Sequence, residues 1–251
     1  MIEGMKMTGH DYNSGGYDKA ILAVGSFESH GPHLPLGTDT LISYRLAKKV
    51  TERVKGLLLL PPITVGYSEH YAHFPLTLTL RAETMVEVLK DILRSAIKHG
   101  IRKIFILNGH DGNIAPIDLA TRAVKTEFPE ARLVSLDAWW VSAGRLLPHG
   151  TFEVWDGLGH GGEGETSMAL ALFEELIQME HARGVVPNLP ANMDVKWDFA
   201  ELTDCGTTGD PTKATVEKGR LIEKVLLEAL VSFFEDMEGR DWDYRSVRSA
   251  R

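Results

Sequence analysis

The stretch ETMVEVLKDILRSAIKHGIRKIFIL at residues 83–107 carries the clearest structural signal in the chain. Its first part spaces apolar residues three and four apart, which predicts an amphipathic helix over Glu83–His99. Gly100 then stands just past the helix end, where a residue in the left-handed conformation is common. Lys103–Leu107 (KIFIL) is a nearly continuous apolar run, typical of a strand buried on both faces. A helix followed at once by a buried strand indicates an α/β fold.

The same alternation runs through most of the chain. Three further runs predict buried strands: Ala20–Val24 (AILAV), Leu57–Leu60 (LLLL) and Arg132–Leu136 (RLVSL). Four further amphipathic stretches predict helices: Thr40–Val54, with Thr38 or Asp39 near its N-cap, Ile114–Phe128, Thr166–Gln178 and Thr212–Met237. This pattern predicts a three-layer α/β/α domain with a mostly parallel central sheet. We expect residues 1–240 to form this single domain and residues 241–251 to be a flexible tail.

Composition narrows the class of protein. The chain has 251 residues, of which 43% are hydrophobic and 25% charged, as in ordinary globular domains. Its 27 basic and 35 acidic residues give a net charge of −8 without a basic stripe, which argues against a nucleic-acid partner. No apolar run approaches the roughly 18 residues of a membrane span, and residues 1–16 lack the apolar core of a secretory signal. We therefore expect a cytoplasmic protein without a membrane partner.

The cysteine and serine content restricts the chemistry. Cys205 is the only cysteine, so the chain can form no internal disulfide and no metal site built from several thiolates. Any metal ion would then be held by His, Asp and Glu. Nucleophilic serine catalysis lacks support, because no Gly-x-Ser-x-Gly sequence follows a predicted strand.

Three glycine-containing loops are crowded with residues of the kind that bind metals. Gly25–Thr40 (GSFESHGPHLPLGTDT) and Asn108–Asn113 (NGHDGN) follow predicted strands, and Gly159–Ser167 (GHGGEGETS) leads into a predicted helix. In open α/β sheets, ligands bind beyond the carboxyl ends of the strands, where such loops meet. Each loop alone has an ordinary interpretation as solvated histidines, surface ion pairs or helix-capping carboxylates. Three such loops at compatible positions favour a shared site.

The first loop offers two carboxylates and an imidazole. Glu28 and His30 are two residues apart, so an extended chain directs both side chains to one side. A turn stiffened by two prolines can then bring Asp39 back toward them. This set suits Zn²⁺ or Mn²⁺, and a carboxylate can bridge two ions.

The other two loops add to this set. His110 directly follows a predicted strand, and neighbouring glycines leave the backbone free to place it. The third loop offers His160, Glu163 and Glu165, although both glutamates are also favourable in the first turn of a helix. A glycine-rich loop before a helix can instead hold phosphate. That alternative stays open for the second loop, although no lysine accompanies it.

Three motifs stand in a fixed order: Glu-Ser-His-Gly-Pro-His-Leu-Pro-Leu-Gly-Thr-Asp at 28–39, Asn-Gly-His at 108–110 and His-Gly-Gly-x-x-Glu-Thr-Ser at 160–167. Their order and spacing resemble the creatininase (creatinine amidohydrolase) family across residues 20–180. The resemblance implies a three-layer α/β/α fold and two divalent metal ions (Zn²⁺, Mn²⁺ or Fe²⁺). It implies a small-molecule amide substrate, whose C–N bond is hydrolysed by a water bridged between the ions. It also implies a homo-oligomer, namely a hexamer built as a trimer of dimers.

The resemblance assigns roles to individual residues. It implies four metal ligands, with Glu28 and His110 on one ion, His30 on the other and Asp39 bridging both. It implies proton transfer by His160, and Glu165 is a second candidate for moving the proton to the leaving nitrogen. Five nearby residues are candidates for substrate contact: Ser68, His70, Asp111, Asn113 and Asp156. The segment 184–211 shows no periodicity, and we expect it to cover one edge of the domain or to form an oligomer contact.

The chain departs from creatinine-hydrolysing members at three positions. Asp111 stands where those enzymes carry an aromatic residue. Gly112 stands where those enzymes carry a glutamate ligand, so Glu165, Asp111 or water replaces it, or the second ion binds more weakly. Asp156 stands where they carry a tryptophan, with Trp155 adjacent but out of register. The substrate therefore stays open among cyclic amides, formamido-pyrimidines, peptide-derived redox cofactors and cyclic sugar ketones.

Two alternatives to a creatinine hydrolase follow. One is a formamidopyrimidine deformylase of the same family, although that branch lacks the His-Gly-Gly-x-x-Glu-Thr-Ser loop. The other is a non-catalytic, metal-stabilised ligand-binding protein, which the altered ligand position at Gly112 favours.

Overall fold

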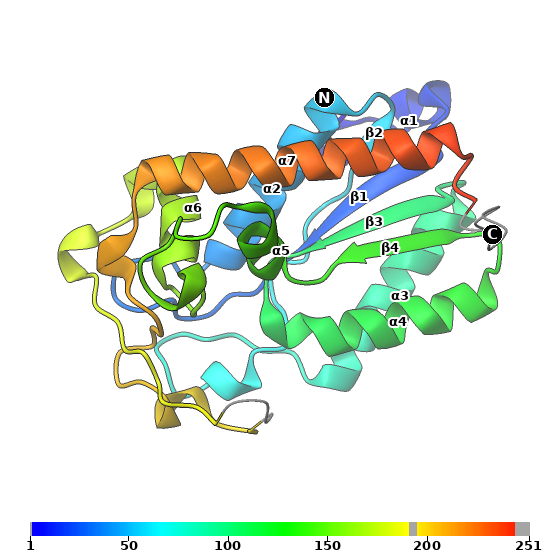
Figure 1. Ribbon diagram of the computed structural model, residues 1–251. Coiled ribbons are helices and arrows are strands. Elements are labelled where there is room, and N and C mark those ends of the chain that lie inside the picture. Colours follow the sequence, from blue (N-terminus) through cyan, green and yellow to red (C-terminus); the bar gives the residue numbers. More distant parts are fainter. Residues whose placement is uncertain (1, 191–194, 244–251) are drawn as a thin grey trace, which may run out of the picture.

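The computed structural model describes residues 2–190 and 195–243. Its centre is a four-stranded sheet made of β1 (Lys19–Val24), β2 (Leu57–Leu59), β3 (Lys103–Asn108) and β4 (Arg132–Leu136). The paired strands are all parallel and lie in the order β2-β1-β3-β4 (Figure 1). The four predicted strands and the parallel sheet are confirmed.

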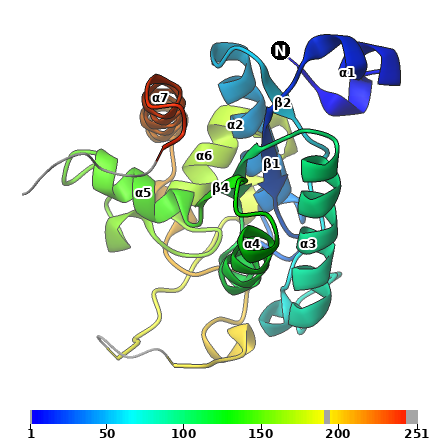
Figure 2. The ribbon, with the colours of Figure 1, turned by 90° about the vertical axis from the view of Figure 1, so that its right-hand side faces the viewer.

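Helices cover both faces of the sheet (Figure 2). One face packs against α2 (Thr38–Arg53), α5 (Trp139–Leu146), α6 (Glu163–Phe173) and α7 (Val216–Gly239). The other face packs against α3 (Ala82–Lys98) and α4 (Ile114–Glu127). A short helix, α1 (Gly9–Gly15), lies beside the β2 edge. The predicted three-layer α/β/α architecture is therefore confirmed.

The alternation of side chains along the strands explains the two cores. In β1, Ile21 and Ala23 join the cluster beneath α2, α6 and α7. Ala20, Leu22 and Val24 join the cluster beneath α3 and α4. All five are fully buried. Burial on both faces is the reason why the strand is a continuous apolar run in the sequence.

The helix boundaries refine the predicted ones. The strongest predicted helix is confirmed as α3, and Gly100 follows it in the left-handed conformation with φ 98°. Helix α7 begins at Val216 rather than Thr212, because the Thr215 hydroxyl accepts a hydrogen bond from the Lys218 amide and caps the helix. The short helices α1 and α5 were not predicted, since one or two turns give too little periodicity to detect.

Two corrections bear on the site. Helix α2 begins at Thr38 after Gly37, and neither Thr38 nor Asp39 caps it with its side chain. The Asp39 carboxylate is buried and turns toward a histidine instead. Helix α6 begins at Glu163, three residues earlier than predicted, so Glu165 lies on a helix rather than in a loop.

The end of the described chain is packed. Trp242, inside the predicted tail, is buried with its ring near those of Phe233 and Phe234, and Arg132 Nε donates to its carbonyl oxygen at 2.8 Å. The rest of the predicted tail, residues 244–251, lies outside the described residues. No helix in the described ranges is long and apolar enough to cross a membrane.

The strand order brings two of the candidate loops together. The chain goes from β1 to β2 on one side and then crosses to β3 on the other side of β1. The loops after β1 and β3 therefore diverge at a switch point, which is where open α/β sheets bind ligands. Gly109 allows a close approach there, because a Cβ on it would lie 2.4 Å from the Asp39 carbonyl oxygen.

Candidate active site

Six side chains meet beyond the carboxyl ends of β1 and β3. They form three overlapping groups, each with its ligand atoms within 4.8 Å of one another: Glu28, Asp39 and His110; His30, Asp39 and Glu165; and Glu28, His30 and His160. All except His160 are buried. The structure thus brings the four predicted metal ligands together with the two predicted catalytic residues.

Asp39 stands between two histidines. Its Oδ1 lies 2.9 Å from Nε2 of His30, and its Oδ2 lies 3.3 Å from Nδ1 of His110. The Ser26 hydroxyl donates to Oδ2 at 2.6 Å. Burial opposes the charge, yet His30 and His110 hold the pKa of this carboxyl well below its usual value. Two oxygens that face two different imidazoles suit a carboxylate that bridges two cations.

Glu28 is a buried carboxylate to which no donor in the described part of the chain makes a hydrogen bond. Its Oε1 lies 3.1 Å from Nδ1 of His110 and 3.8 Å from Nδ1 of His160. Both oxygens are buried and accept no hydrogen bond from the residues that the structure describes. Leaving such a group unpartnered is costly, and a cation bound between it and the histidines removes that cost.

Each histidine of the cluster turns one ring nitrogen to a backbone carbonyl. The three contacts are His30 Nδ1 to the Glu28 carbonyl (3.2 Å), His110 Nε2 to that of Tyr67 (2.9 Å) and His160 Nε2 to that of Ser29 (2.6 Å). Since a carbonyl only accepts, we assign the hydrogen of each neutral ring to that nitrogen. The other nitrogen then presents its lone pair to the carboxylates. Outer partners of this kind orient metal-binding imidazoles.

The three histidines differ in how readily they take a proton. Burial opposes protonation of His30 and His110, but the carboxylates around them outweigh it and raise the pKa of both rings well above the usual value. For His160, burial and repulsion by His30 lower the pKa to about 3. His160 is therefore the neutral imidazole of the cluster. A cation competes with protons for the other two, because only a neutral imidazole can ligate.

Glu165 is one of the two residues that could replace the glutamate ligand missing at Gly112. Its Oε1 is 3.7 Å from Nε2 of His30, and its Oε2 accepts the Gly161 amide at 2.6 Å. It shares a ligand group with His30 and Asp39. Asp111, the other candidate, is exposed in the pocket wall and belongs to none of the ligand groups found among the described residues.

Gly112 has no room for a side chain. A Cβ there would lie 2.1 Å from the Tyr67 carbonyl oxygen and 2.5 Å from Nε2 of His110. These two atoms form the contact that orients the His110 ring. A glutamate at this position would therefore displace a ligand rather than add one.

The predicted substrate residues lie at different distances from the cluster. Asp111 lines the pocket above it. Ser68 Oγ is 3.3 Å from Nε2 of His110. His70 stacks on the His110 ring with a centroid distance of 5.9 Å and an interplanar angle of 12°. Ser68 and His70 thus contact the outer side of a predicted ligand.

The remaining two candidates are placed differently. Asn113 is fully buried, where its side chain accepts from the Tyr67 amide and donates to the Gly25 carbonyl, so it ties loops together. Asp156 is exposed with φ 54°, between Trp155 and Gly157, which both line the pocket.

A pocket of about 270 Å³ opens onto the cluster and suits a small ligand. Asp39, His110, His160 and Glu165 line it together with an aromatic and apolar wall that includes Tyr71, Trp140, Trp155, Leu158, Trp197 and Phe199. The Tyr71 ring lies 4.3 Å from the ring centroids of both His160 and Phe199. Sequence reasoning missed Tyr71, Trp140, Trp197 and Phe199, because they come from short helices and loops without a periodic pattern.

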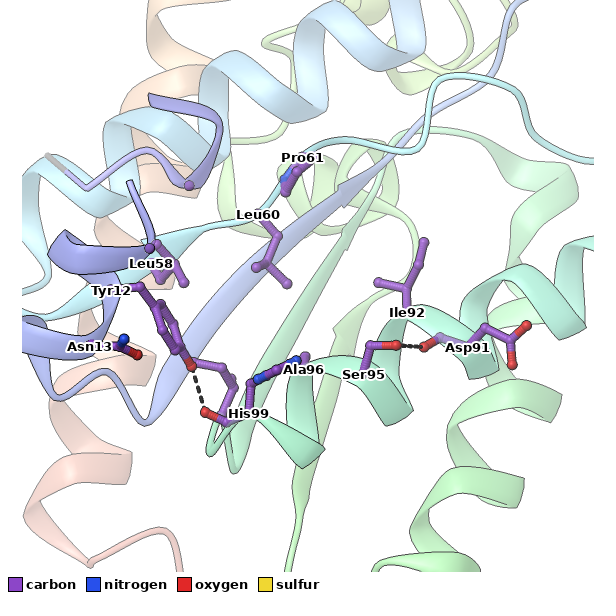
Figure 3. A pocket seen from close by; sticks show the side chains of 13 residues that line it. Tyr12, Asn13, Leu58, Leu60, Pro61, Asp91, Ile92, Ser95, Ala96 and His99 are labelled. Carbon is purple, nitrogen blue, oxygen red and sulfur yellow. Dashed lines mark hydrogen bonds between the residues drawn. The ribbon is translucent and has the colours of Figure 1, made fainter. Parts of the chain in front are cut away.

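A larger pocket of about 750 Å³ lies between α1, the end of β2 and α3 (Figure 3). The Tyr12 hydroxyl donates to the His99 carbonyl oxygen at 2.6 Å across it. Much of its wall is apolar, with Leu58, Leu60 and Ile92 among the residues that line it. None of the six clustered residues belongs to its lining. Among the described residues, four of the six clustered side chains line the smaller pocket and none lines the larger one.

Comparisons with known proteins agree with this site. The creatininase family model, described as creatinine amidohydrolase, matches residues 5–234. The creatinine amidohydrolase of Pseudomonas putida is 33% identical over 229 residues, which cover 84% of this chain and 86% of that protein. The mycofactocin precursor peptide peptidase of Mycobacterium ulcerans (strain Agy99) is 31% identical over 225 residues, covering 84% and 82%. A solved structure named Creatininase Mn has a TM-score of 0.79 at 30% identity, covering 94% of this chain and 98% of that one.

The family match spans nearly the whole chain, and the structural similarity covers the same α/β fold. Both confirm the resemblance that the three sequence motifs indicated. The chain belongs to the creatininase family, whose members include hydrolases of C–N bonds in non-peptide substrates.

Proposed function

We propose that the protein is a metal-dependent amidohydrolase that uses two divalent ions to hydrolyse an amide or formamide C–N bond of a small molecule. The observation that carries this proposal is the buried Glu28 carboxylate, which accepts no hydrogen bond from the described residues and faces the ring nitrogens of His110 and His160. Nitrogen and oxygen donors of this kind suit Zn²⁺, Mn²⁺ or Fe²⁺.

The ligand groups indicate which residues would hold the ions. Asp39 belongs to two of the groups and would be shared, with Glu28 and His110 on one side and His30 and Glu165 on the other. Three carboxylates balance most of the charge of two divalent ions. Bound ions of this kind lower the pKa of water toward neutrality and polarise a carbonyl.

His160 is the residue that we propose to move the proton. Its Nε2–H is fixed on the Ser29 carbonyl, and its Nδ1 faces the Glu28 carboxylate. A neutral imidazole with a free lone pair accepts a proton from an attacking water and passes it to the leaving nitrogen of an amide. Glu165 lines the same pocket and is the second group within reach of that proton.

The pocket wall favours a substrate that is neutral or positively charged. Beyond the cluster its lining is mainly aromatic and apolar, with the carboxylate of Asp111 exposed in it. No lysine or arginine lines the pocket in the ranges that the structure describes. Creatinine, other cyclic amides, formamides and short peptides are therefore the first compounds to test, and the two curated relatives act on substrates of the first and last kinds by name.

The third loop weighs against both alternatives. It contributes His160 and Glu165 to the cluster. By the family resemblance described above, the deformylase branch lacks this loop. The binding-protein alternative rested on the missing glutamate at Gly112. Since Glu165 approaches His30 and Asp39 instead, that reason no longer holds.

Elemental analysis tests the proposal, on protein purified without chelator or affinity-tag metal. We expect two Zn, Mn or Fe per chain and hydrolysis of at least one compound of the set above. One ion per chain would indicate a weak second site, and hydrolysis should then rise when Mn²⁺ or Zn²⁺ is added. No metal, with no binding on titration, would overturn the proposal. Metal-dependent thermal stabilisation without any hydrolysis would support the binding protein instead.

We also propose that the protein works as a homo-oligomer in the cytoplasm. Val185, Val186 and Leu189 in the segment 184–211 are large apolar residues with exposed side chains. Clustered exposed apolar residues are typical of protein contacts. Size-exclusion chromatography with light scattering tests the oligomer, and a single-chain mass at micromolar concentration would contradict it.

A further inference from the structure

Glu163 stands among the ligand-type residues of the third loop, but its partners in the structure are different. It is fully buried in the first turn of α6 and belongs to none of the three ligand groups. Its two oxygens accept the Glu153 amide at 3.0 and 2.9 Å, and Oε2 also accepts the Val154 amide at 2.9 Å. The Lys218 ammonium, in the first turn of α7, donates to Oε1 at 2.6 Å.

Lys218, on helix α7, binds the same segment of the chain as Glu163. Its ammonium also donates to Glu153 Oε1 at 3.1 Å and to the Lys213 carbonyl at 2.9 Å. Burial opposes its charge, but hydrogen bonds to Glu163 and Glu153 raise the pKa of the amine above its usual value. One buried carboxylate and one ammonium therefore join α6, α7 and the backbone at residues 153–154. Removing Lys218 leaves the buried Glu163 carboxylate without its counter-charge, and removing the Glu163 charge leaves Lys218 paired with Glu153 alone.

The chain held in this way leads directly into the pocket wall. Val154 is followed by Trp155 with φ 51° and Asp156 with φ 54°, both in the left-handed region. Residues with side chains persist in this region only where surrounding contacts determine the backbone. Trp155 lines the active-site pocket together with His160, although its side chain stays 40% exposed. Because its ring is partly exposed, the backbone before it has to hold Trp155 in place.

We propose that Glu163 and Lys218 are positioning residues that hold Trp155 in the wall of the active-site pocket. The inference rests on the proposed function only in taking this pocket as the substrate site. Glu163 lies three residues after His160 and two before Glu165, so the helix start that presents both groups also anchors the wall beside them. Loss of the pair releases residues 153–157 and leaves the metal ligands in place.

The test is ¹⁹F NMR on the full chain, loaded with Zn²⁺ and labelled with 5-fluorotryptophan. The chain has five tryptophans, and Trp155→Phe identifies the signal of Trp155. We expect Glu163→Gln and Lys218→Met to move or broaden that signal by more than its linewidth. The signals of Trp139 and Trp242, which are buried in the core, should stay in place. Zinc per chain should stay at the wild-type value in both variants.

Lys213→Met is the matched control. Lys213 Nζ approaches Glu153 Oε2 at 3.4 Å, and no hydrogen bond to Glu163 is found for it in the described structure. Lys213→Met removes a positive charge close to Lys218 but leaves the Glu163–Lys218 pair intact, so the Trp155 signal should match that of the wild type. The inference is overturned if both Glu163→Gln and Lys218→Met leave that signal unchanged, or if Lys213→Met moves it equally.

The same spectra distinguish a variant that fails to fold from a variant in which only the surroundings of Trp155 change. A variant that fails to fold would shift the Trp139 and Trp242 signals as well, and the other variant would then decide. The readout needs no turnover. A wild-type protein without hydrolysis would thus count against the proposed function, whereas an unmoved Trp155 signal would count against the positioning pair.

Discussion

Nε2 of His30 lies 2.9 Å from Oδ1 of Asp39, and both side chains are almost completely buried. They are nine positions apart in the chain, and the first turn of α2 returns Asp39 to the loop after β1. Two buried ionisable groups in contact stabilise the fold only when each keeps its partner or a cation replaces it. Substitutions at this pair therefore test the metal centre directly.

Asp39→Ala should abolish hydrolysis and remove bound metal, because Asp39 is the residue shared by two ligand groups. His30→Ala should have the same effect on hydrolysis. Circular dichroism should show that both variants keep the fold. Asp91→Ala is the control, since that carboxylate is exposed on α3 and should leave metal content and turnover unchanged. Near-normal turnover in either site variant would contradict the two-metal proposal.

His160→Ala should keep the metal content and lower kcat by about 10²–10⁴-fold, the usual contribution of a general acid–base group. The expectation follows from the Nε2–H bond to the Ser29 carbonyl, which leaves the lone pair of Nδ1 facing the cluster, 3.8 Å from Glu28 Oε1. His73→Ala provides a control, because its ring is 70% exposed and pairs with Asp198 on the surface. Loss of one ion per chain in His160→Ala would show that His160 is a ligand instead.

Gly112→Ala should destabilise the protein by about 1–3 kcal/mol or more, the cost of forcing atoms into a packed site. The added Cβ meets the Tyr67 carbonyl and the His110 ring, so metal content should fall as well. Gly144→Ala is the matched control, because a Cβ there meets nothing within 4 Å in helix α5. It should stabilise by about 0.5–1 kcal/mol. Equal stability of the two variants in urea unfolding would contradict this geometry.

Leu76→Gly should raise the free energy of unfolding by about 0.5–1 kcal/mol. Leu76 has φ 52° and a side chain that is 65% exposed, so the substitution relieves the left-handed conformation and loses little packing. Leu78→Gly is the comparison, because Leu78 has an ordinary φ and its amide donates to the Phe27 carbonyl at 2.9 Å. That variant should be less stable than wild type. A destabilised Leu76→Gly would show that the exposed side chain has a contact partner.

Metal removal should lower the melting temperature. At a free ion concentration 100 times Kd, binding stabilises a fold by about 2.7 kcal/mol, which corresponds to about 5–10 °C for a chain of this size. Thermal unfolding with and without chelator measures the shift, and adding Zn²⁺ or Mn²⁺ should restore it. Inorganic phosphate is the informative control for the Asn108–Asn113 loop. Stabilisation by phosphate and insensitivity to chelator would support a phosphate site there instead.

The sequence alone determined the layers of the fold and the parts of the site that lie in motifs. Strands covered on both faces are apolar at every position, and the long amphipathic helix α3 repeats its apolar stripe over several turns. These patterns involve residues that are close in the sequence, so they can be recognised without knowing how the chain packs. Glu28, His30, Asp39 and His110 follow strands or begin a helix, so the strand order of a parallel sheet already brings them to one edge.

Only the tertiary structure decided which neighbour completes each group. Glu165 rather than Asp111 approaches His30, and Glu163 pairs with Lys218 rather than with the metal ligands, although both glutamates share one short motif. The aromatic wall of the pocket joins Tyr71, Trp155 and Phe199 from separate loops. Contacts of this kind depend on where distant segments cross and which way a helix start is turned. Neither the crossing of distant segments nor the orientation of a helix start produces a periodic pattern in the sequence, because both depend on packing between segments rather than within one segment.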